Sequence, residues 1–438
     1  MSEHQPSTWT KTIVASMTSY IDAGSIVAGA AGLTMWQAYL GMSTQQVGIL
    51  NACSANALSA AVGALIGGRI CDLFGRKLVY TYDLLFYILG MLVIVFSTSY
   101  PMLLAGFIIV GLSVGADVAA SWTLIAENAP AENRARHCGT AQLMWALGPC
   151  VVMLLSALVN YFGLGLLGNK LVFAHLAVIA FIVWIMRLRM PESEEWISNK
   201  EKERQLIEAG VWQKTSYWDL FTNPNNLRGL LLLIGVYMIW NLAAGTMGGL
   251  LPYIYEKVGG LSTTSSQILP ALLFATSCLS TLFIFMTLAD KYSRRVIYCV
   301  IACLFIAAWG IFFLPKEMLG LPLFVLVAVL MGINNGSGQQ AFYQMWAAEM
   351  FPARYRAAAQ GFSFFMARFC LSIWLFLVPV LMGDDGTGMP TVALILVGFA
   401  TISMLIGTIF CPDTAGKTLE QIEEERYGKI ETVAKNEE

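Results

Sequence analysis

The stretch GRICDLFGRK, residues 68–77, is a short charged segment between two long apolar runs. A degraded copy, DKYSRR at residues 290–295, repeats its Asp-x-x-x-Arg-Lys/Arg pattern 218 positions later. Two further hydrophilic markers recur at offsets of 222 and 221: Glu127, Pro130, Arg134 and Gly139 return as Glu349, Pro352, Arg356 and Gly361, and Pro191-Glu192-Ser193 returns as Pro412-Asp413-Thr414. Three markers in the same order at nearly the same offset indicate that two homologous halves make up the chain.

The composition is that of a membrane protein. Of the 438 residues, 57% are hydrophobic and only 12% are charged, whereas a soluble domain carries about 25% charged residues. Apolar stretches of roughly 20 residues recur along the chain, which predicts an all-α protein with many transmembrane helices. A net charge of −2 gives no reason to expect a nucleic-acid partner. The nine cysteines form no CxxC or Cys/His pattern, so we expect no metal site, no cofactor and no disulfide framework.

The apolar runs predict twelve transmembrane helices in two homologous six-helix bundles. Doubling of a six-helix unit is a common construction of secondary transporters, with the substrate between the halves near mid-membrane. The expected spans are 12–40, 46–69, 79–99, 102–126, 139–161, 171–188, 229–255, 265–289, 296–314, 321–347, 361–382 and 391–411. The corresponding division is a cytoplasmic tail 1–11, an N-terminal half 12–188, a cytoplasmic inter-half loop 189–228, a C-terminal half 229–411 and a cytoplasmic tail 412–438.

The basic residues predict the orientation. Alternate loops, beginning with the one between the second and third spans, hold 17 lysines and arginines, Arg187 among them, and the opposite loops hold three. Because cytoplasmic loops carry the excess of Lys and Arg, both termini are expected in the cytoplasm. The chain is therefore expected to be a multi-pass protein of the plasma (inner) membrane, and we expect a monomer.

The segment 68–77 matches G-x-x-x-D-x-x-G-R-[RK], so the chain resembles the major facilitator superfamily, of which this is the hallmark loop. PESEEW at 191–196 and PDTAGKTLE at 412–420 resemble the motifs that follow helices six and twelve of the sugar porter family. This resemblance implies the twelve-helix fold and solute transport, often driven by protons.

The chain also departs from the sugar porter pattern. The Gly-Arg pair that opens helix four of proton-coupled sugar porters is Gly106-Phe107 here, and the Gln-Gln pair of helix seven is absent. Gly115-Ala116-Asp117 and Arg368 instead resemble segments of the metabolite:proton symporter relatives. The resemblance therefore points to a sugar-porter-related metabolite transporter.

The repeated charged markers predict a conformational latch. Glycine lets two helix ends approach, and aspartate caps a helix or pairs with arginine at its terminus. Charge contacts at one membrane face can hold one conformation and release it in another; ordinary solvated loops with positive-inside charge are the alternative. The predicted latch residues are Gly68, Asp72, Gly75, Arg76, Lys77, Glu127, Arg134, Asp290, Arg294, Glu349 and Arg356.

Charges inside the spans are rare and expensive, so they usually face a cavity or a partner. Asp22 lies in the middle of span one and Asp117 in the middle of span four, and we expect them to couple protons to transport; a structural ion pair is the alternative. Two buried carboxylates without a local counter-charge cannot both stay ionised cheaply, so one should hold a proton. Asp117 is the stronger candidate, since its flanking segment is the better family match. Asp83 and His175 are expected to be structural.

Amide and aromatic side chains in spans seven and ten predict the substrate site. Asn335, Gln339 and Tyr343 recur every four residues and are expected to share one helical face. Amides suit the hydroxyl groups of sugars and polyols, and aromatic rings suit their C–H faces; polar contacts between helices are the alternative. The predicted substrate residues are Tyr237, Trp240, Asn241, Asn335, Gln339, Tyr343, Trp346 and Arg368. Trp122 and Trp145 are weaker candidates, with a lipid-facing position as the alternative.

These features predict a secondary active transporter that moves a small hydrophilic metabolite, a sugar or polyol first, by alternating access and proton symport. The partners expected are the solute, protons and the lipid bilayer. A transporter or facilitator of organic anions, with Arg368 binding a carboxylate, is the second hypothesis. A non-transporting membrane sensor is the third. An enzyme is not expected, because no cytosolic catalytic constellation is present.

Overall fold

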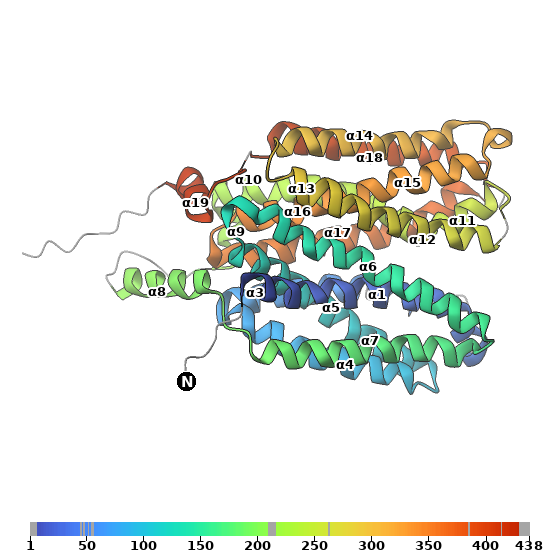
Figure 1. The fold of residues 1–438 in the computed structure, drawn as a ribbon, viewed down its shortest axis with the longest axis horizontal. Helices are drawn as coiled ribbons and strands as arrows, with labels where there is room; N and C mark the ends of the chain where they lie inside the picture. Colours follow the sequence, from blue (N-terminus) through green and yellow to red (C-terminus); the bar gives the residue numbers. More distant parts are fainter. Residues whose placement is uncertain are drawn as a thin grey trace, which may run out of the picture.

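Two bundles of long helices lie side by side with their axes along a common direction (Figure 1). The computed structural model describes residues 7–43, 46, 49–50, 52–53, 57–208, 216–261, 263–383, 386–412 and 414–428. All regular elements in these residues are helical. The first bundle, blue to green in Figure 1, comes from the N-terminal part of the chain, and the second, yellow to red, from the C-terminal part.

The first bundle consists of long helices with short connections. They are α1 (Thr8–Leu40), α3 (Leu58–Phe74), α4 (Arg76–Val95), α5 (Tyr100–Asn128), α6 (Arg134–Tyr161) and α7 (Gly165–Leu188), with a 3₁₀ turn at Ala131–Asn133 before α6. The second span was predicted at 46–69, but α3 extends five residues further, to Phe74. Charged residues at the helix end misled the prediction, because they are buried against other helices and do not end α3.

The second bundle is more interrupted. Its helices are α10 (Pro224–Leu233) and α11 (Ile239–Lys257), α12 (Thr263–Ser280) and α13 (Met286–Leu288), α14 (Arg294–Gly310), α15 (Leu321–Ser337) and α16 (Gln339–Glu349), α17 (Ala353–Met382) and α18 (Met389–Phe410). One π-helical turn, Ile234–Met238, joins α10 to α11, and another, Thr281–Phe285, joins α12 to α13. Gly338 separates α15 from α16 within the predicted tenth span.

Three short helices lie together at one end of the molecule, on the left in Figure 1: α8 (Glu194–Glu208), α9 (Asp219–Thr222) and α19 (Leu419–Tyr427). We call this end the basic end, because the arginine-rich segments at residues 76–77, 134–136 and 294–295 also lie there.

Eleven helical stretches of the described residues are long and apolar enough to cross a membrane. The element α3 falls just short of that length at 17 residues, and the segment before it is only partly described. Large apolar side chains face outward from these helices, including Phe283, which is 69% exposed, and Val380, which is 71% exposed. This surface suits a hydrocarbon environment.

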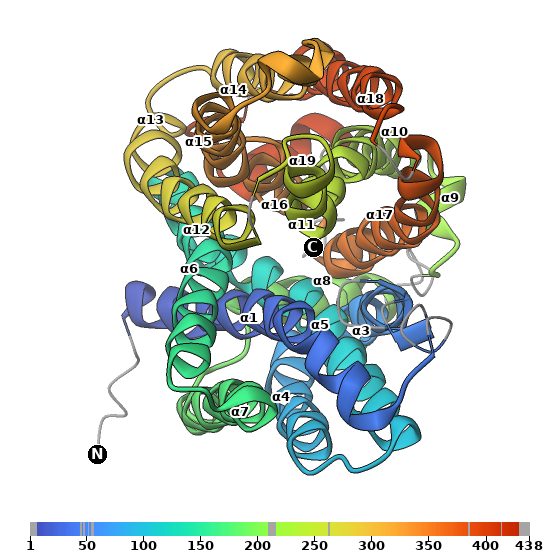
Figure 2. The same ribbon diagram turned by 90° about the vertical axis from the view of Figure 1, so that its right-hand side faces the viewer.

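The bundles meet closely where α3 packs on α17 and α6 packs on α12 (Figure 2). Two glycines permit the first of these contacts. A Cβ atom at Gly68 would lie 2.3 Å from the carbonyl oxygen of Ala357, and one at Gly361 would lie 2.1 Å from that of Ala64. Gly361 is the copy of Gly139, whereas Gly68, in the segment 68–77, has Met286 at the corresponding position. The close approach of α3 and α17 therefore depends on one glycine from each of two charged markers.

Candidate functional site

A first ionic cluster joins the bundles at the basic end. Glu127, in the last turn of α5, accepts hydrogen bonds from Arg76 of α4 and from Arg356 of α17, both at 2.8 Å. Arg76 also lies 3.2 Å from Asp72 and donates to the carbonyl oxygen of Ala353 at 2.6 Å. These side chains are almost completely buried, so each charge depends on its partners rather than on water.

A second cluster repeats this arrangement with the roles of the bundles exchanged. Glu349, at the end of α16, accepts from Arg294 of its own bundle and from Arg134 of the other, both at 2.9 Å. Arg294 lies 3.6 Å from Asp290, as Arg76 lies near Asp72. Thr414 donates to Glu349 at 2.5 Å. The sequence repeat is therefore a repeat of contacts as well.

In each cluster an aspartate caps a helix of the opposite bundle. Asp72 accepts from the backbone N–H groups of Ala357 and Ala358 in the first turns of α17, at 3.2 and 2.7 Å. Asp290 accepts from those of Ala135 and Arg136 at the start of α6, at 2.9 and 3.0 Å. A carboxylate at a helix N-terminus is stabilised by the unpaired N–H groups and by the helix dipole. Opening the basic end would remove both caps.

The segment after α7 adds a carboxylate to the first cluster. Glu192 accepts from the backbone N–H groups of Arg76 and Lys77, at 3.1 and 3.0 Å. Gly75 has a φ of 99°, and a Cβ atom there would lie 2.2 Å from Glu192 Oε2. Lys77, predicted as a latch residue, takes part through its backbone, since its side chain is exposed. The counterpart of Glu192, Asp413, lies outside the described residues.

Two carboxyls of this network outside the membrane-spanning helices have shifted pKa values. Burial raises the pKa of Glu195, although Arg356 at 2.9 Å lowers it. Burial likewise raises the pKa of Asp290, against the lowering effect of the helix N–H groups that it caps. Exposure to water on opening would return both toward their ordinary values. Protonation of these two groups therefore favours the closed basic end, and that contribution is lost as the pH rises through the raised pKa.

A separate group of charges is buried inside the first bundle around Arg187. Its guanidinium lies 2.9 Å from Asp117 and 3.4 Å from Asp83, and it donates to the carbonyl oxygen of Tyr80 and to the hydroxyl of Thr18. The Tyr80 ring lies 3.9 Å from the guanidinium carbon. Arg187 is fully buried.

This geometry corrects two expectations. Arg187 was assigned to a loop, but it lies in the last complete turn of α7, and helical side chains point back toward the N-terminus of their helix. Asp117 was expected to lack a local counter-charge, and Arg187 supplies one. Asp83, expected to be structural, is the second carboxylate on the same guanidinium.

Asp22 of α1 is the third carboxylate of this region. Its side chain is 1% exposed, and its Oδ2 has no hydrogen-bond partner among the described residues. Phe107, at the position where sugar porters carry an arginine, packs edge-on against Phe173 and supplies no charge. Within the described part of the chain, Asp22 thus has no direct ion pair, whereas Asp117 is paired with Arg187.

Amide side chains form a further set of contacts between the bundles, separate from the ionic clusters. Gln142 of α6 donates to the carbonyl oxygen of Asn335 at 2.5 Å and accepts from Gln344 of α16 at 3.0 Å. Thr123 of α5 donates to Gln360 of α17 at 2.8 Å. These bonds leave polar atoms without partners among the described residues, including Gln344 Oε1, Gln360 Nε2 and Gln340 Nε2. Unpaired buried amides at a junction of two bundles are available to a hydroxylated ligand.

Several predicted substrate residues adjoin this junction. Tyr237 stacks on Tyr343 with ring centres 3.9 Å apart, and Phe364 lies beside them. The Tyr237 hydroxyl and the Asn241 amide nitrogen are buried without partners among the described residues. Arg368 of α17 lies over the Phe364 ring at 4.8 Å.

Other predicted substrate residues are engaged within the second bundle. Trp240 donates to Asn334 at 3.0 Å, and Asn334 donates to Gln339 at 2.6 Å. Trp346 packs against Tyr298 and Phe342. The expectation of one shared face for Asn335, Gln339 and Tyr343 is wrong, because the helix is interrupted at Gly338 between the first two of these residues.

Sequence reasoning ranked two central tryptophans, Trp122 and Trp145, as weaker candidates and missed two central glutamines. Trp122 is 2% exposed, donates to Ser19 at 3.1 Å, and lies 6.3 Å from Tyr343 of the other bundle, so a lipid-facing position is excluded. Trp145 is likewise buried beside it. Gln142 and Gln360 were not singled out. A signal existed for both, since each is a lone glutamine within a largely apolar helix of the membrane region.

Comparison with known proteins identifies relatives over nearly the whole length. The chain is 53% identical over 426 residues to the minor myo-inositol transporter IolF of Bacillus subtilis, covering 97% of this chain and 95% of that one. It is 26% identical to the glucose transporter GlcP of Staphylococcus epidermidis, covering 84% of this chain and 86% of that one.

The fold is that of solved transporters. The sugar-bound proton:xylose symporter XylE of E. coli superposes with a TM-score of 0.76 at 18% identity, covering 95% of this chain and 98% of that one. An inward-open structure of XylE gives a lower TM-score, 0.64, over 96% of this chain and all of that one.

Residues 12–369 match the Major Facilitator Superfamily. Together with the doubled bundles and their paired ionic clusters, this match shows that the chain is an integral, multi-pass membrane protein that belongs to the major facilitator superfamily, a family of transporters rather than enzymes.

Proposed function

We propose that the protein carries a sugar or polyol across the membrane by alternating access, with myo-inositol as the first candidate substrate. The observation that carries this proposal is the 53% identity, over nearly the full length of both chains, to a myo-inositol transporter. A second myo-inositol transporter of Bacillus subtilis, IolT, is 24% identical over 83% of this chain and 83% of that one.

The junction between the bundles supports a neutral polyhydroxylated solute. Buried amides of Gln340, Gln344 and Gln360 have donors or acceptors to offer, and hydroxyl groups can use both. Trp122 and Tyr343 supply aromatic rings at the same junction, and the Tyr343 hydroxyl donates to the backbone carbonyl oxygen of Gln360 at 3.1 Å. A cyclic polyol presents hydroxyl groups around its rim and C–H bonds to such rings, so this lining matches its chemistry.

In alternating access, the two ionic clusters would hold the bundles together at the basic end and so close that face of the transporter. By the positive-inside rule we place the basic end, and with it both termini, in the cytoplasm of a plasma (inner) membrane protein. The closed clusters then correspond to a state whose cytoplasmic face is shut. Opening that face would break the bonds of Arg356 to Glu127 and of Arg134 to Glu349 and would leave the bonds within each half intact. We propose a monomer, since each chain supplies both halves of the closure.

Proton coupling is proposed to reside in the first bundle. Three carboxylates, Asp22, Asp83 and Asp117, are buried, and one guanidinium serves all three: Arg187 pairs directly with Asp83 and Asp117 and interacts electrostatically with Asp22. Burial of uncompensated negative charge is unfavourable, so at least one of the three is expected to hold a proton. Asp22 is the proposed carrier, because Asp117 is paired directly with Arg187 whereas Asp22 Oδ2 is not paired within the described residues. This reverses the preference for Asp117 that the sequence alone suggested.

Uptake into proteoliposomes tests the substrate. Labelled myo-inositol should accumulate in vesicles that contain the protein, and unlabelled polyols and hexoses should compete. Strong competition by a carboxylate solute and none by polyols would favour an organic-anion transporter, with Arg368 as the anion-binding group. Absence of uptake of any solute by protein that still binds myo-inositol would favour a sensor.

The coupling proposal needs two measurements on each variant. Asp22→Asn should abolish accumulation driven by a pH gradient but should retain counterflow, which needs no net proton movement. Asp117→Asn tests the paired carboxylate in the same way. If Asp22→Asn accumulates myo-inositol like the wild type, Asp22 is not the proton carrier. If the wild type equilibrates solute without responding to the gradient, the protein is a facilitator.

A further inference from the structure

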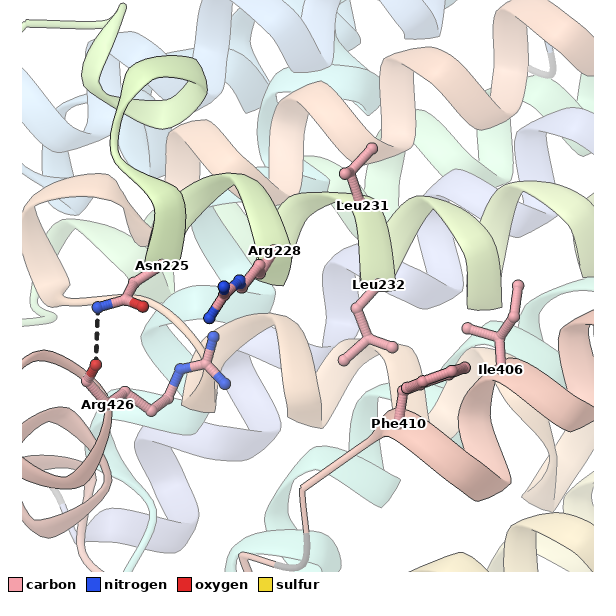
Figure 3. A pocket seen from close by; sticks show the side chains of 7 residues that line it. All are labelled: Asn225, Arg228, Leu231, Leu232, Ile406, Phe410 and Arg426. Atoms are coloured by element: carbon pink, nitrogen blue, oxygen red, sulfur yellow. Dashed lines mark hydrogen bonds between the residues drawn. The ribbon is translucent and has the colours of Figure 1, made fainter.

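An open pocket of about 610 Å³ lies between α10, α18 and α19 at the basic end of the second bundle (Figure 3). Arg228 and Asn225 come from α10, and Arg426 comes from α19. The rest of the lining is apolar and is supplied by Leu231, Leu232, Ile406 and Phe410. None of these residues belongs to the ionic clusters or to the junction between the bundles.

The two arginine side chains extend toward each other across the pocket, and none of the described residues that line it is a carboxylate (Figure 3). Neither guanidinium forms a salt bridge in the part of the chain that the structure describes. Of the four carboxylates of α19, Glu420 lies 3.6 Å from Lys202 and Glu425 lies 2.7 Å from Lys417. The other two, Glu423 and Glu424, form no salt bridge with either arginine among the described residues. Two neighbouring cations without a shared anion repel each other, and an anion between them would relieve the repulsion.

The arrangement is fixed by contacts that hold α19 against the bundle. Asn225 donates to the backbone carbonyl oxygen of Arg426 at 2.9 Å, and Tyr427 donates to Asn226 at 2.8 Å. Gly229 leaves room for the guanidinium, because a Cβ atom there would lie 3.2 Å from Arg426 Nη2. The docking of α19 against α10 therefore holds Arg426 beside Arg228.

The apolar side of the pocket decides what kind of anion fits. Leu231 is 59% exposed and Phe410 is 67% exposed, and both lie on helices whose outer surface is apolar. A free phosphate ion would make no use of these side chains. A phospholipid would place its phosphate between the arginines and its acyl chains along Leu231 and Phe410. Basic pockets between transmembrane helices at a headgroup level are suited to such lipids.

We propose that this pocket binds the headgroup of an anionic phospholipid, with Arg228 and Arg426 as its two ligands. The site is separate from the solute path, so this proposal does not depend on the identity of the substrate. Each arginine near an anionic headgroup contributes about 1 kcal/mol, or about fivefold in affinity.

Native mass spectrometry of the full chain in a mild detergent tests the proposal. Phosphatidylglycerol, phosphatidylcholine and inorganic phosphate are added in separate arms to the wild type, Arg228→Gln, Arg426→Gln and the double variant. Arg189→Gln is the matched control, because Arg189 is an exposed arginine that ends α7 at the same end of the other bundle. Melting temperature with and without each addition shows that every variant is folded.

The wild type should retain phosphatidylglycerol in preference to phosphatidylcholine. Retention should weaken about fivefold in each single variant and about 25-fold in the double variant, and Arg189→Gln should behave like the wild type. Equal retention by the double variant and the wild type would overturn the proposal, and so would equal loss in Arg189→Gln. Displacement of phosphatidylglycerol by millimolar inorganic phosphate would show a soluble-anion site and would also overturn it. The single variants remain informative if the double variant does not fold.

Discussion

Replacement of Arg356 by glutamine should open the basic end. Arg356 makes one bond to the first bundle, to Glu127 at 2.8 Å, and one to Glu195 of α8, between the two halves, at 2.9 Å. A charged hydrogen bond contributes about 1.5–3 kcal/mol when buried. The bond to Glu127 counts in full, because both side chains are buried; the bond to Glu195 is discounted, because its carboxylate is 23% exposed. Glu127 also keeps Arg76 as a partner. The closed state should therefore lose about 2–3 kcal/mol relative to the open state, or about 30- to 150-fold in the equilibrium.

A native cysteine reports the opening. Cys138 is buried and lies four residues after Arg134 in α6, on the same helical face as the second cluster. If opening is fast compared with labelling, the rate at which a hydrophilic maleimide labels Cys138 follows the open population. The labelling rate of Cys138 in Arg356→Gln should therefore rise about 30- to 150-fold. The increase is smaller only if the variant is already open most of the time.

The matched control is Arg204→Gln, which removes an exposed ion pair with Glu208 within α8. Its labelling rate should equal that of the wild type. An unchanged rate in folded Arg356→Gln would refute the reasoning, because it would mean that the bonds of Arg356 to Glu127 and Glu195 do not hold the face closed.

Three further outcomes are expected. Gly361→Ala should also speed labelling of Cys138, because its new methyl group would collide with α3, whereas Gly398→Ala on α18, where nothing lies within 4 Å, should not. Asn241→Ala should weaken the apparent affinity for myo-inositol about two- to twelvefold by removing a hydrogen bond to the solute; Gln339→Ala should lower the melting temperature instead, because its amide is bonded inside the bundle. A cysteine at Lys202 should resist an impermeant reagent added outside intact cells, and strong labelling there would contradict the proposed orientation.

The sequence predicted the architecture because the signals for it are repeated and strong. Long apolar runs predict membrane helices whatever the details of their packing. The constant offset between markers such as Glu127 and Glu349 indicates the two homologous halves. The charged residues of the two ionic clusters could also be singled out, since Asp72, Arg76 and their copies stand out as charges at helix ends; their role as a latch stays a prediction. Their partners were not predicted, because the pairing of Glu127 with Arg356 depends on how the two bundles dock.

The site inside the bundles was predicted less well, for identifiable reasons. In the sequence, Arg187 adjoins the basic loop after α7 and so resembles a loop residue. Its side chain points back along α7, which places the guanidinium inside the bundle. The periodicity of Asn335, Gln339 and Tyr343 assumed a continuous helix, which Gly338 interrupts. Gln142 and Gln360 each stand alone in a largely apolar helix, so no spacing pattern pointed to them, and only the docked bundles bring them together.

The two helix-capping aspartates have a consequence for the origin of the protein. Asp72 of the first half caps a helix of the second, and Asp290 of the second half caps the equivalent helix of the first. In a homodimer this reciprocal pattern would be called isologous: the same surface patch serves on both partners. A six-helix ancestor could therefore have closed against its own copy with one set of residues, and fusion of two gene copies would have preserved the closure without any new contact. Since then each half has been free to diverge. The first half has acquired the carboxylates around Arg187, and the second half has acquired interrupted helices.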